Sequence, residues 1–209
     1  MEPVIVFGAG GHALSVLDIL QTERRYHVTY IADKNPVKDA NFWGIPVIEE
    51  NEVQLSLVKK AIVAIGDNHI RKSVSEKLTE AGFQLVNAVS PYSYVSEKAK
   101  LGNGIVIMPF AVIGPGTSVA DGVIVNTKAS IDHDCRIEKY SHIAPGSTIC
   151  GFVDIGEKTF FCAGATVKDS VQIGNNCVVG AGAVVVKNVP DNCNVMGVPA
   201  KSRKEDVNA

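Results

Sequence analysis

The sequence of 209 residues predicts an α/β domain over residues 1–88, followed by a parallel β-helix over residues 89–209. Two observations carry this prediction. Strand-like and helix-like segments alternate in the first part, and a strict six-residue period runs through the second. The composition agrees, because 46% of the residues are hydrophobic but 6% are aromatic, and 19 are glycine. A glycine-rich chain with few aromatic residues favours a repetitive β structure over a sandwich with a bulky core.

The first part is predicted to be a Rossmann-like domain, in which helices connect the strands of a parallel sheet. A helical pattern follows the first strand, and a helix is also expected after each of the third and fourth strands. The helix over residues 68–81 begins at the capping residue Asp67 and ends before Gly82. The expected strands are 3–7, 27–31, 44–48, 60–65 and 83–88.

A glycine-rich loop, GAGGHA from Gly8 to Ala13, follows the first strand and opens the first helix. Glycines let the backbone approach a phosphate, and the N–H groups at the helix N-terminus stabilise its charge. Asp33 lies about 20 residues further on, where an acidic side chain meets ribose hydroxyls in nucleotide-binding folds. We therefore predict nucleotide binding. The alternative is a tight turn that needs glycine for packing alone.

The six-residue period runs from Val95 to Pro190 without an insertion. In all 16 hexads the first residue is apolar and the fifth is small or of medium size, and in nine the fourth is Gly, Asn or Asp. We expect the first residue to fill the core and the fourth to turn a corner in left-handed backbone. Three hexads then close one triangular coil, and neighbouring coils pair through main-chain hydrogen bonds.

Two histidines of the predicted β-helix are candidates for acid–base chemistry. His133 holds the third place of its hexad and should project outward at a corner, beside Asp134 at the turn. His142 holds the sixth place, where we expect it to face solvent on a flat side. A neighbouring carboxylate raises the pKa of a histidine and makes it a better base, whereas the alternative is a surface histidine in a polar corner. Without a GxSxG motif, direct transfer is favoured over a covalent intermediate.

Charge and targeting patterns exclude several classes of partner. The chain has 20 Lys and Arg residues and 22 Asp and Glu residues, which gives a net charge of -2. We therefore expect neither nucleic acid nor an anionic membrane as a partner. The N-terminus has no basic region, and no apolar stretch approaches the roughly 18–20 residues that span a bilayer. The five cysteines never form CxxC, which disfavours structural zinc and disulfides and indicates a cytoplasmic location.

Five segments together resemble a known family over essentially the whole chain: VFGAGGHA, IADKNP, IGDNHIR, NTKASIDHDCRIEKYSHIAPGSTICG and MGVPAK. The chain resembles the hexapeptide-repeat acetyltransferases of bacterial surface-glycan pathways, which act on nucleotide sugars and sialic acid. It is similar in particular to the UDP-4-amino-sugar N-acetyltransferases of the PglD type. The resemblance implies a left-handed, trimeric β-helix with active sites between subunits. It also implies acetyl transfer from acetyl-CoA to the 4-amino group of a nucleotide-linked sugar, with a UDP-sugar favoured.

The resemblance further implies roles for individual residues. His133 is the general base, and Asp134 raises its basicity. No metal is implied, and two β-helix histidines without a third nearby do not match the three-histidine zinc site of hexapeptide carbonic anhydrases. The implied acetyl-CoA contacts are His142, Gly151, Ala163, Gly197, Pro199 and Lys201. The implied nucleotide-sugar pocket consists of Gly8, Gly10, Gly11, His12, Ala32, Asp33 and Gly66.

Two other functions stay open on the sequence. One is O-acetylation of sialic acid or another sugar hydroxyl by the same architecture. The other is a non-catalytic nucleotide-binding scaffold. No motif determines whether the nucleotide is UDP, dTDP or GDP, and none determines the sugar.

Overall fold

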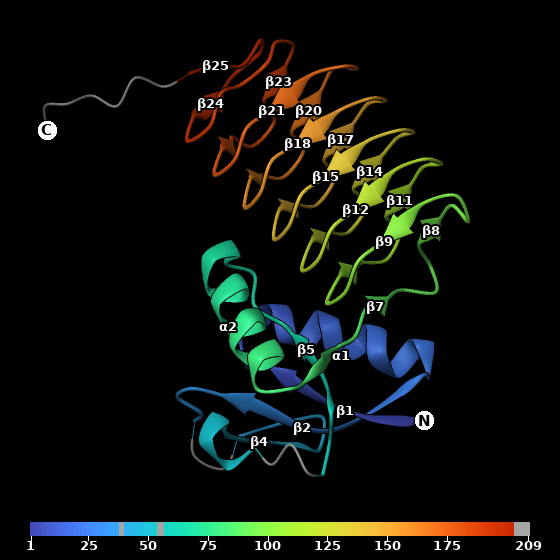
Figure 1. Ribbon diagram of the computed structural model, residues 1–209, viewed down its shortest axis with the longest axis vertical. Coiled ribbons are helices and arrows are strands. Elements are labelled where there is room, and N and C mark those ends of the chain that lie inside the picture. The colour runs from blue at the N-terminus through green and yellow to red at the C-terminus, as the bar shows by residue number, and fades with distance from the viewer. Residues whose placement is uncertain (38–39, 54–56, 203–209) are drawn as a thin grey trace, which may run out of the picture.

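The computed structural model describes residues 1–37, 40–53 and 57–202. An α/β domain is followed by a left-handed parallel β-helix, which confirms the predicted fold class (Figure 1). Across the described part of the chain, no helix is long and apolar enough to cross a membrane.

The α/β domain is built on a six-stranded sheet with the strand order β3-β4-β2-β1-β5-β6. Alternate residues of β1 point to opposite faces of this sheet: Val4 and Val6 pack with α1, whereas Ile5 and Phe7 pack in the cluster that contains Leu78 of α2. The two helices therefore cover opposite faces. The elements are β1 (Glu2–Phe7), α1 (Gly11–Glu23), β2 (Tyr26–Asp33), β3 (Asn41–Phe42), β4 (Ile45–Glu49), β5 (Lys60–Val63), α2 (Asn68–Glu80) and β6 (Gln84–Leu85).

Two expectations for this domain are wrong. The strand at 44–48 is followed by a short 3-10 turn, η1 (Glu50–Glu52), where a helix was expected, and residues 54–56 lie outside the described residues. The strand expected at 83–88 is two strands. β6 joins the α/β sheet, and β7 (Ala88–Val89) pairs with the β-helix. Asn87 makes the switch, because its side chain donates to Gly102 O and accepts from Ile105 N in the first coil.

The β-helix has three faces of short strands, and paired residues in successive coils are 18 positions apart up to β22, whose pairing with β24 spans 16 positions. The docked face, whose first coils the α/β domain covers, comprises β7, β10 (Val106–Ile107), β13 (Ile124–Val125), β16 (His142–Ile143), β19 (Phe160–Phe161), β22 (Val178–Val179), β24 (Asn194–Met196) and β25 (Lys201–Ser202). The uncharged face comprises β8 (Tyr94–Val95), β11 (Val112–Ile113), β14 (Ser130–Ile131), β17 (Thr148–Ile149), β20 (Thr166–Val167) and β23 (Val184–Val185). The charged face comprises β9 (Lys100–Leu101), β12 (Ser118–Val119), β15 (Arg136–Ile137), β18 (Asp154–Ile155) and β21 (Gln172–Ile173).

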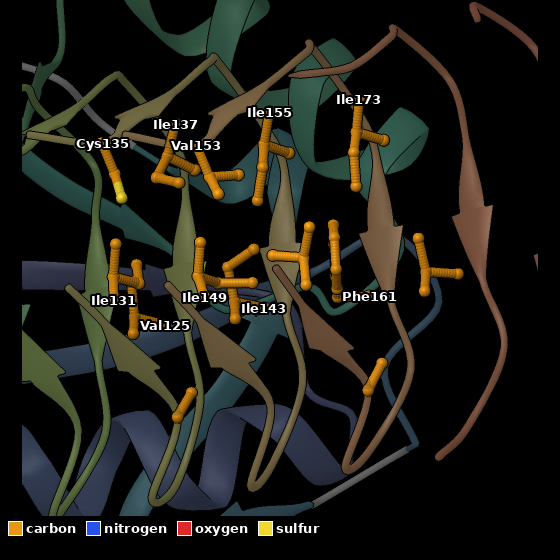
Figure 2. Packing of buried hydrophobic residues seen from close by; sticks show 14 of the residues in the cluster. Val125, Ile131, Cys135, Ile137, Ile143, Ile149, Val153, Ile155, Phe161 and Ile173 are labelled. Atoms are coloured by element: carbon orange, nitrogen blue, oxygen red, sulfur yellow. The ribbon is translucent and has the colours of Figure 1, made fainter. Parts of the chain in front are cut away.

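The core of the β-helix follows the hexads. Figure 2 shows Ile137, Ile155 and Ile173 at matching places in successive coils, each pointing into the interior. The fourth residue of every hexad from Gly104 to Gly182 has a positive φ, including bulky residues such as Tyr140. Left-handed backbone costs an L-residue roughly 1–2 kcal/mol. Pairing between coils stabilises the left-handed backbone at the corners. The fourth hexad position is therefore often glycine but also accepts other residues.

The two domains share one buried cluster, in which α1 packs on outward-facing residues of the docked face. Val106, Met108 and Ile124 belong to the same buried cluster as Leu17 and Leu20 of α1. We propose the domain boundary at residue 88, where β7 begins and the chain passes from the α/β sheet to the β-helix.

Candidate active site

A cleft of about 1310 Å³ opens at the carboxyl ends of β1 and β5. These neighbouring strands lead into α1 and α2 on opposite faces of the sheet, and such a switch point is where open α/β sheets bind ligands. The N-terminus of α1 has no side-chain cap, because Gly10 occupies the N-cap position. In α2, by contrast, Asp67 accepts hydrogen bonds from the N–H groups of His69 and Ile70. The uncapped end of α1 is therefore suited to an anion from outside the chain.

The glycines of the loop fall into two groups. Gly8 has a φ of +104°, and a Cβ there would lie 2.7 Å from Ile65 Cγ1, so the chain itself requires this glycine. A Cβ at Gly10, Gly11 or Gly66 would meet nothing within 4 Å. The fold does not need glycine at these three positions, and the space beside them is open to a ligand.

Asp33 and Ala32 support the loop from the neighbouring strand. Asp33 Oδ2 accepts from the N–H of Ala9 at 2.8 Å, and Oδ1 accepts from the N–H of Asn35 at 2.9 Å. Asp33 also lines the cleft, so its carboxylate both organises the loop and faces the ligand space. The expectation that Ala32 lines the pocket is wrong, because Ala32 is fully buried and its carbonyl accepts from Gly8 N beneath the loop.

His142 does not face solvent, which corrects the sequence expectation. It points outward from β16, but the α/β domain covers that face and leaves the residue 8% exposed. Its Nδ1 lies 3.4 Å from Gly66 O, which accepts, and its Nε2 lies 3.0 Å from Asn126 Nδ2. The ring is neutral and protonated on Nδ1, because Gly66 O is an acceptor and Asn126 Nδ2 is a donor.

His12 lies next to His142, with 6.4 Å between the ring centroids, and also lines the cleft. Its Nε2 is buried without a hydrogen-bond partner among the described residues. Burial and the nearby Arg71 charge lower the pKa of His12 to about 4 and that of His142 to about 3. Both rings are therefore neutral hydrogen-bonding groups near pH 7.

A second site lies at the corner between the uncharged and charged faces, which we call the histidine corner (His133, Asp134, Gly151 and Phe152). The side chain of His133 is 44% exposed, as expected, and its Nδ1 lies 3.0 Å from Asp134 Oδ2. Phe152 packs its ring edge-on, with centroids 5.0 Å apart. Gly151 occupies the same place one coil later, and a Cβ there would lie 2.7 Å from His133 Nε2. The absence of a side chain at Gly151 therefore makes room for the imidazole.

The structure separates several residues that the sequence grouped together. The histidine corner is opposite the docked face in the triangular coil, so His133 does not face the cleft of its own chain. Ala163 lies at the corner between the docked and uncharged faces, away from Gly151. The segment from Gly197 to Lys201 lies at the last coil, at the far end of the β-helix from the α/β domain (Figure 1). No group of three or more His, Cys, Asp and Glu side chains in the described ranges is placed to hold a metal ion.

Sequence reasoning missed two residues at the docked face. Asn126 holds His142, and Arg71 of α2 is fully buried against the β-helix. Both residues lie in segments that carry the family resemblance, IGDNHIR and NTKASIDHDC, but those segments assigned them no role. An arginine in a polar helix normally indicates a solvated side chain.

Comparison with known proteins agrees with this architecture. The family model described as the PglD N-terminal domain matches residues 3–78, and the bacterial transferase hexapeptide model (six repeats) matches residues 152–187. GDP-perosamine N-acetyltransferase from Escherichia coli O157:H7 is 31% identical over 95% of this chain and 95% of its own length. The chain belongs to the PglD-type family of hexapeptide-repeat sugar N-acetyltransferases.

Solved structures place this PglD-type protein among enzymes of the same shape. A histidine-to-asparagine variant of perosamine N-acetyltransferase from Caulobacter crescentus, in complex with CoA and GDP-perosamine, has a TM-score of 0.94 at 36% identity, with 98% of both chains covered. The acetyltransferase domain of PglB from Neisseria gonorrhoeae FA1090, in complex with acetyl coenzyme A, has a TM-score of 0.90 at 34% identity, with 97% of this chain and 99% of that domain covered.

Proposed function

We propose that this protein transfers the acetyl group of acetyl-CoA to the 4-amino group of a nucleotide-linked amino sugar. The observation that carries the proposal is the combination of an open, uncapped glycine cleft with an exposed His133–Asp134 pair on a β-helix. Two similar structures support it, because one holds CoA and GDP-perosamine and the other holds acetyl coenzyme A.

We propose UDP or GDP as the nucleotide, ahead of dTDP, the third nucleotide that the sequence left open. The resemblance in sequence favours UDP, whereas two relatives at 31% and 36% identity are described with GDP-perosamine. Titration calorimetry with GDP and UDP against the whole protein decides between them. The nucleotide that binds more tightly identifies the nucleotide part of the acceptor.

His133 acts as the general base in this proposal. Asp134 accepts a hydrogen bond from Nδ1, which leaves the lone pair of Nε2 free to accept a proton. The sugar amine adds to the thioester carbonyl and loses its proton to Nε2. In this proposal a main-chain N–H near Gly151 stabilises the oxyanion. The C–S bond then breaks, and the CoA thiolate leaves and is protonated by the imidazolium. General-base assistance of this kind contributes about 10²–10⁴-fold to the rate.

We further propose a homotrimer with sites between subunits. The histidine corner and the cleft of one chain face different directions, so the site is incomplete without a second copy. The uncharged face offers a surface for this contact, because its outward residues carry no charge: Tyr94, Val112, Ser130, Thr148, Thr166 and Val184. A partner copy packed there would bring His133 of one subunit beside the cleft of the next. Sedimentation that shows an active monomer would overturn this arrangement.

The five cysteines are free thiols in the structure, which supports a reducing cytoplasm as the location.

Thiol release tests the activity. The protein is incubated with acetyl-CoA and, separately, a GDP-linked 4-amino sugar, a UDP-linked 4-amino sugar and sialic acid, while free thiol is followed. We expect release with one nucleotide-linked amino sugar. Release with sialic acid alone would establish the O-acetyltransferase alternative. No release with any acceptor, together with nucleotide binding, would establish the scaffold alternative.

A further inference from the structure

Arg71 is the largest fully buried side chain in the described part of the protein, and the reaction proposed above does not use it. It lies in the first turn of α2, where that helix meets the β-helix. No Asp or Glu oxygen among the described residues lies within 4.0 Å of its guanidinium. A buried cation without a carboxylate partner is costly unless hydrogen bonds satisfy it.

Carbonyl oxygens from both domains satisfy Arg71. Its Nε donates to Gly122 O at 2.7 Å, and its Nη2 donates to Tyr140 O at 2.7 Å. Its Nη1 donates to Ile65 O at 3.1 Å and to Gly66 O at 3.0 Å, in the wall of the cleft. One rigid guanidinium fork therefore connects the cleft wall to the β-helix.

The β-helix partners form a regular series. Gly122, Tyr140 and Lys158 are successive residues of one corner, 18 positions apart, and each has a positive φ. Arg71 binds the carbonyls of the first two, and Asn68 donates to the carbonyl of Lys158 at 3.0 Å. The first turn of α2 thus engages three consecutive coils, which sets its height along the β-helix.

His142 is connected to this cluster. Gly66 O accepts from Arg71 Nη1 and lies 3.4 Å from His142 Nδ1. The charged and titratable groups that act on His142 are Arg71 of α2 and His12 of α1. A shift of Arg71 would therefore move the cleft wall and the buried histidine together.

We propose that Arg71 is a positioning residue for acetyl transfer, which sets the nucleotide-sugar cleft and the ring of His142 at a defined height on the β-helix. This inference rests on the proposed function for its kinetic consequence. Its structural consequence, the neutral and fixed state of His142, is independent of that function.

Two variants distinguish the contribution of the Arg71 charge from that of its guanidinium geometry. Arg71→Lys keeps the charge but loses the five-donor geometry, whereas Arg71→Met removes both. The matched control is Lys72→Met, because Lys72 also connects α2 to the β-helix through Glu157 at 2.8 Å, but at the exposed edge of the junction. Kinetic constants are measured on protein shown to be folded by circular dichroism, and the imidazole signals of His12 and His142 are titrated by NMR.

We expect folded Arg71→Lys to lose about 10–100-fold in kcat, since a misplacement of about 1 Å can cost about a hundredfold. The KM for acetyl-CoA is expected to stay near that of the unaltered protein. The kcat of Lys72→Met should stay within about twofold of that of the unaltered protein, because exposed ion pairs contribute little to stability. In Arg71→Met the pKa of His142 should rise, because the neighbouring positive charge is gone, while Arg71→Lys should leave it low. A purely structural role would lower stability without moving kcat in the folded variant.

Folded Arg71→Lys with an unchanged kcat would overturn the inference. If both Arg71 variants fail to fold, Asn68→Ala replaces them. Asn68 Oδ1 accepts from Arg71 Nη2 at 2.8 Å, so this variant removes one acceptor of Arg71 and the contact to the third coil while keeping the charge. An unchanged kcat in Asn68→Ala would then also overturn the inference. If the unaltered protein transfers no acetyl group, the proposed function fails separately, and the His142 titration still tests Arg71.

Discussion

His133 and His142 lie nine residues apart on adjacent stretches of the same β-helix, yet their surroundings are opposite. His133 is at an open corner, where a carboxylate holds one ring nitrogen and the other is free. His142 is beneath the α/β domain, where a carbonyl and an amide hold both nitrogens. The difference teaches that residue type does not determine the role. The face of the coil and what covers it decide whether an imidazole can exchange a proton.

The same contrast applies to the glycines. Gly8 and Gly151 make room for other parts of the protein, whereas Gly10 and Gly11 leave space that no part of the chain fills. A substitution therefore has a different consequence in each group. At Gly8 or Gly151 it should disturb folding or the histidine corner, and at Gly10 or Gly11 it should disturb ligand binding.

The largest effect is expected from His133→Ala. Loss of the general base should lower kcat by about a hundredfold or more, with little change in acetyl-CoA affinity, because the fold around an exposed corner is preserved. Steady-state kinetics measure both. The exposed His27→Ala is the control and should have no effect. An unchanged kcat would show that His133 is not the general base and that the two histidines do not differ in this way.

Gly11→Val should come next in size. Its side chain would occupy the open space at the N-terminus of α1 and displace a phosphate from the N–H groups there. Because a hydrogen bond to a charged group contributes about 1.5–3 kcal/mol, KM for the nucleotide sugar should rise about 10–100-fold. Binding of acetyl-CoA, measured by calorimetry, should be unaffected.

The comparison variant for Gly11→Val is Gly8→Ala. It should act on folding, with a loss of about 1–3 kcal/mol in the free energy of unfolding, because its φ is strained and its Cβ meets Ile65. A normal KM in folded Gly11→Val would show that the phosphate does not bind at this loop.

A smaller effect is expected from Gly151→Ala. Its methyl group would collide with the His133 ring and displace it, so kcat should fall about tenfold. The coil itself accepts a side chain there, since Asp169 occupies the same place one coil later. The double variant His133→Ala, Gly151→Ala should therefore have the kcat of His133→Ala alone. Additive losses would show that Gly151 acts independently of the ring.

The smallest effect is expected in the pH dependence of stability that the buried His142 causes. The pKa of His142 is about 3 in the folded protein, below its ordinary value of 6.5. The unfolded chain therefore binds more protons between these values, and folding stability decreases as pH falls through this window. His142→Asn should lose less stability than the unaltered protein between pH 7 and pH 4, by about 1–3 kcal/mol. Thermal unfolding at both pH values measures this, and equal losses would contradict the buried, neutral state.

The sequence by itself determined most of the fold. The hexads specified the coils, because an inward residue every six positions is incompatible with any helix of period 3.6. The alternation of strands and helices specified the α/β domain, and the glycine loop identified the edge of the sheet where the cleft opens. His133 could also be placed at an exposed corner, because a corner position depends on the hexad alone.

What only the tertiary structure decided is how the two domains meet. The hexads show that His142 points away from the core of the β-helix, but they cannot show that α1 and α2 cover that face. The split of 83–88 into two strands and the burial of Arg71 have the same origin. Each depends on contacts between residues 15 to 76 positions apart, such as Asn87 with Gly102 and Arg71 with Tyr140, and local periodicity contains no information about such contacts.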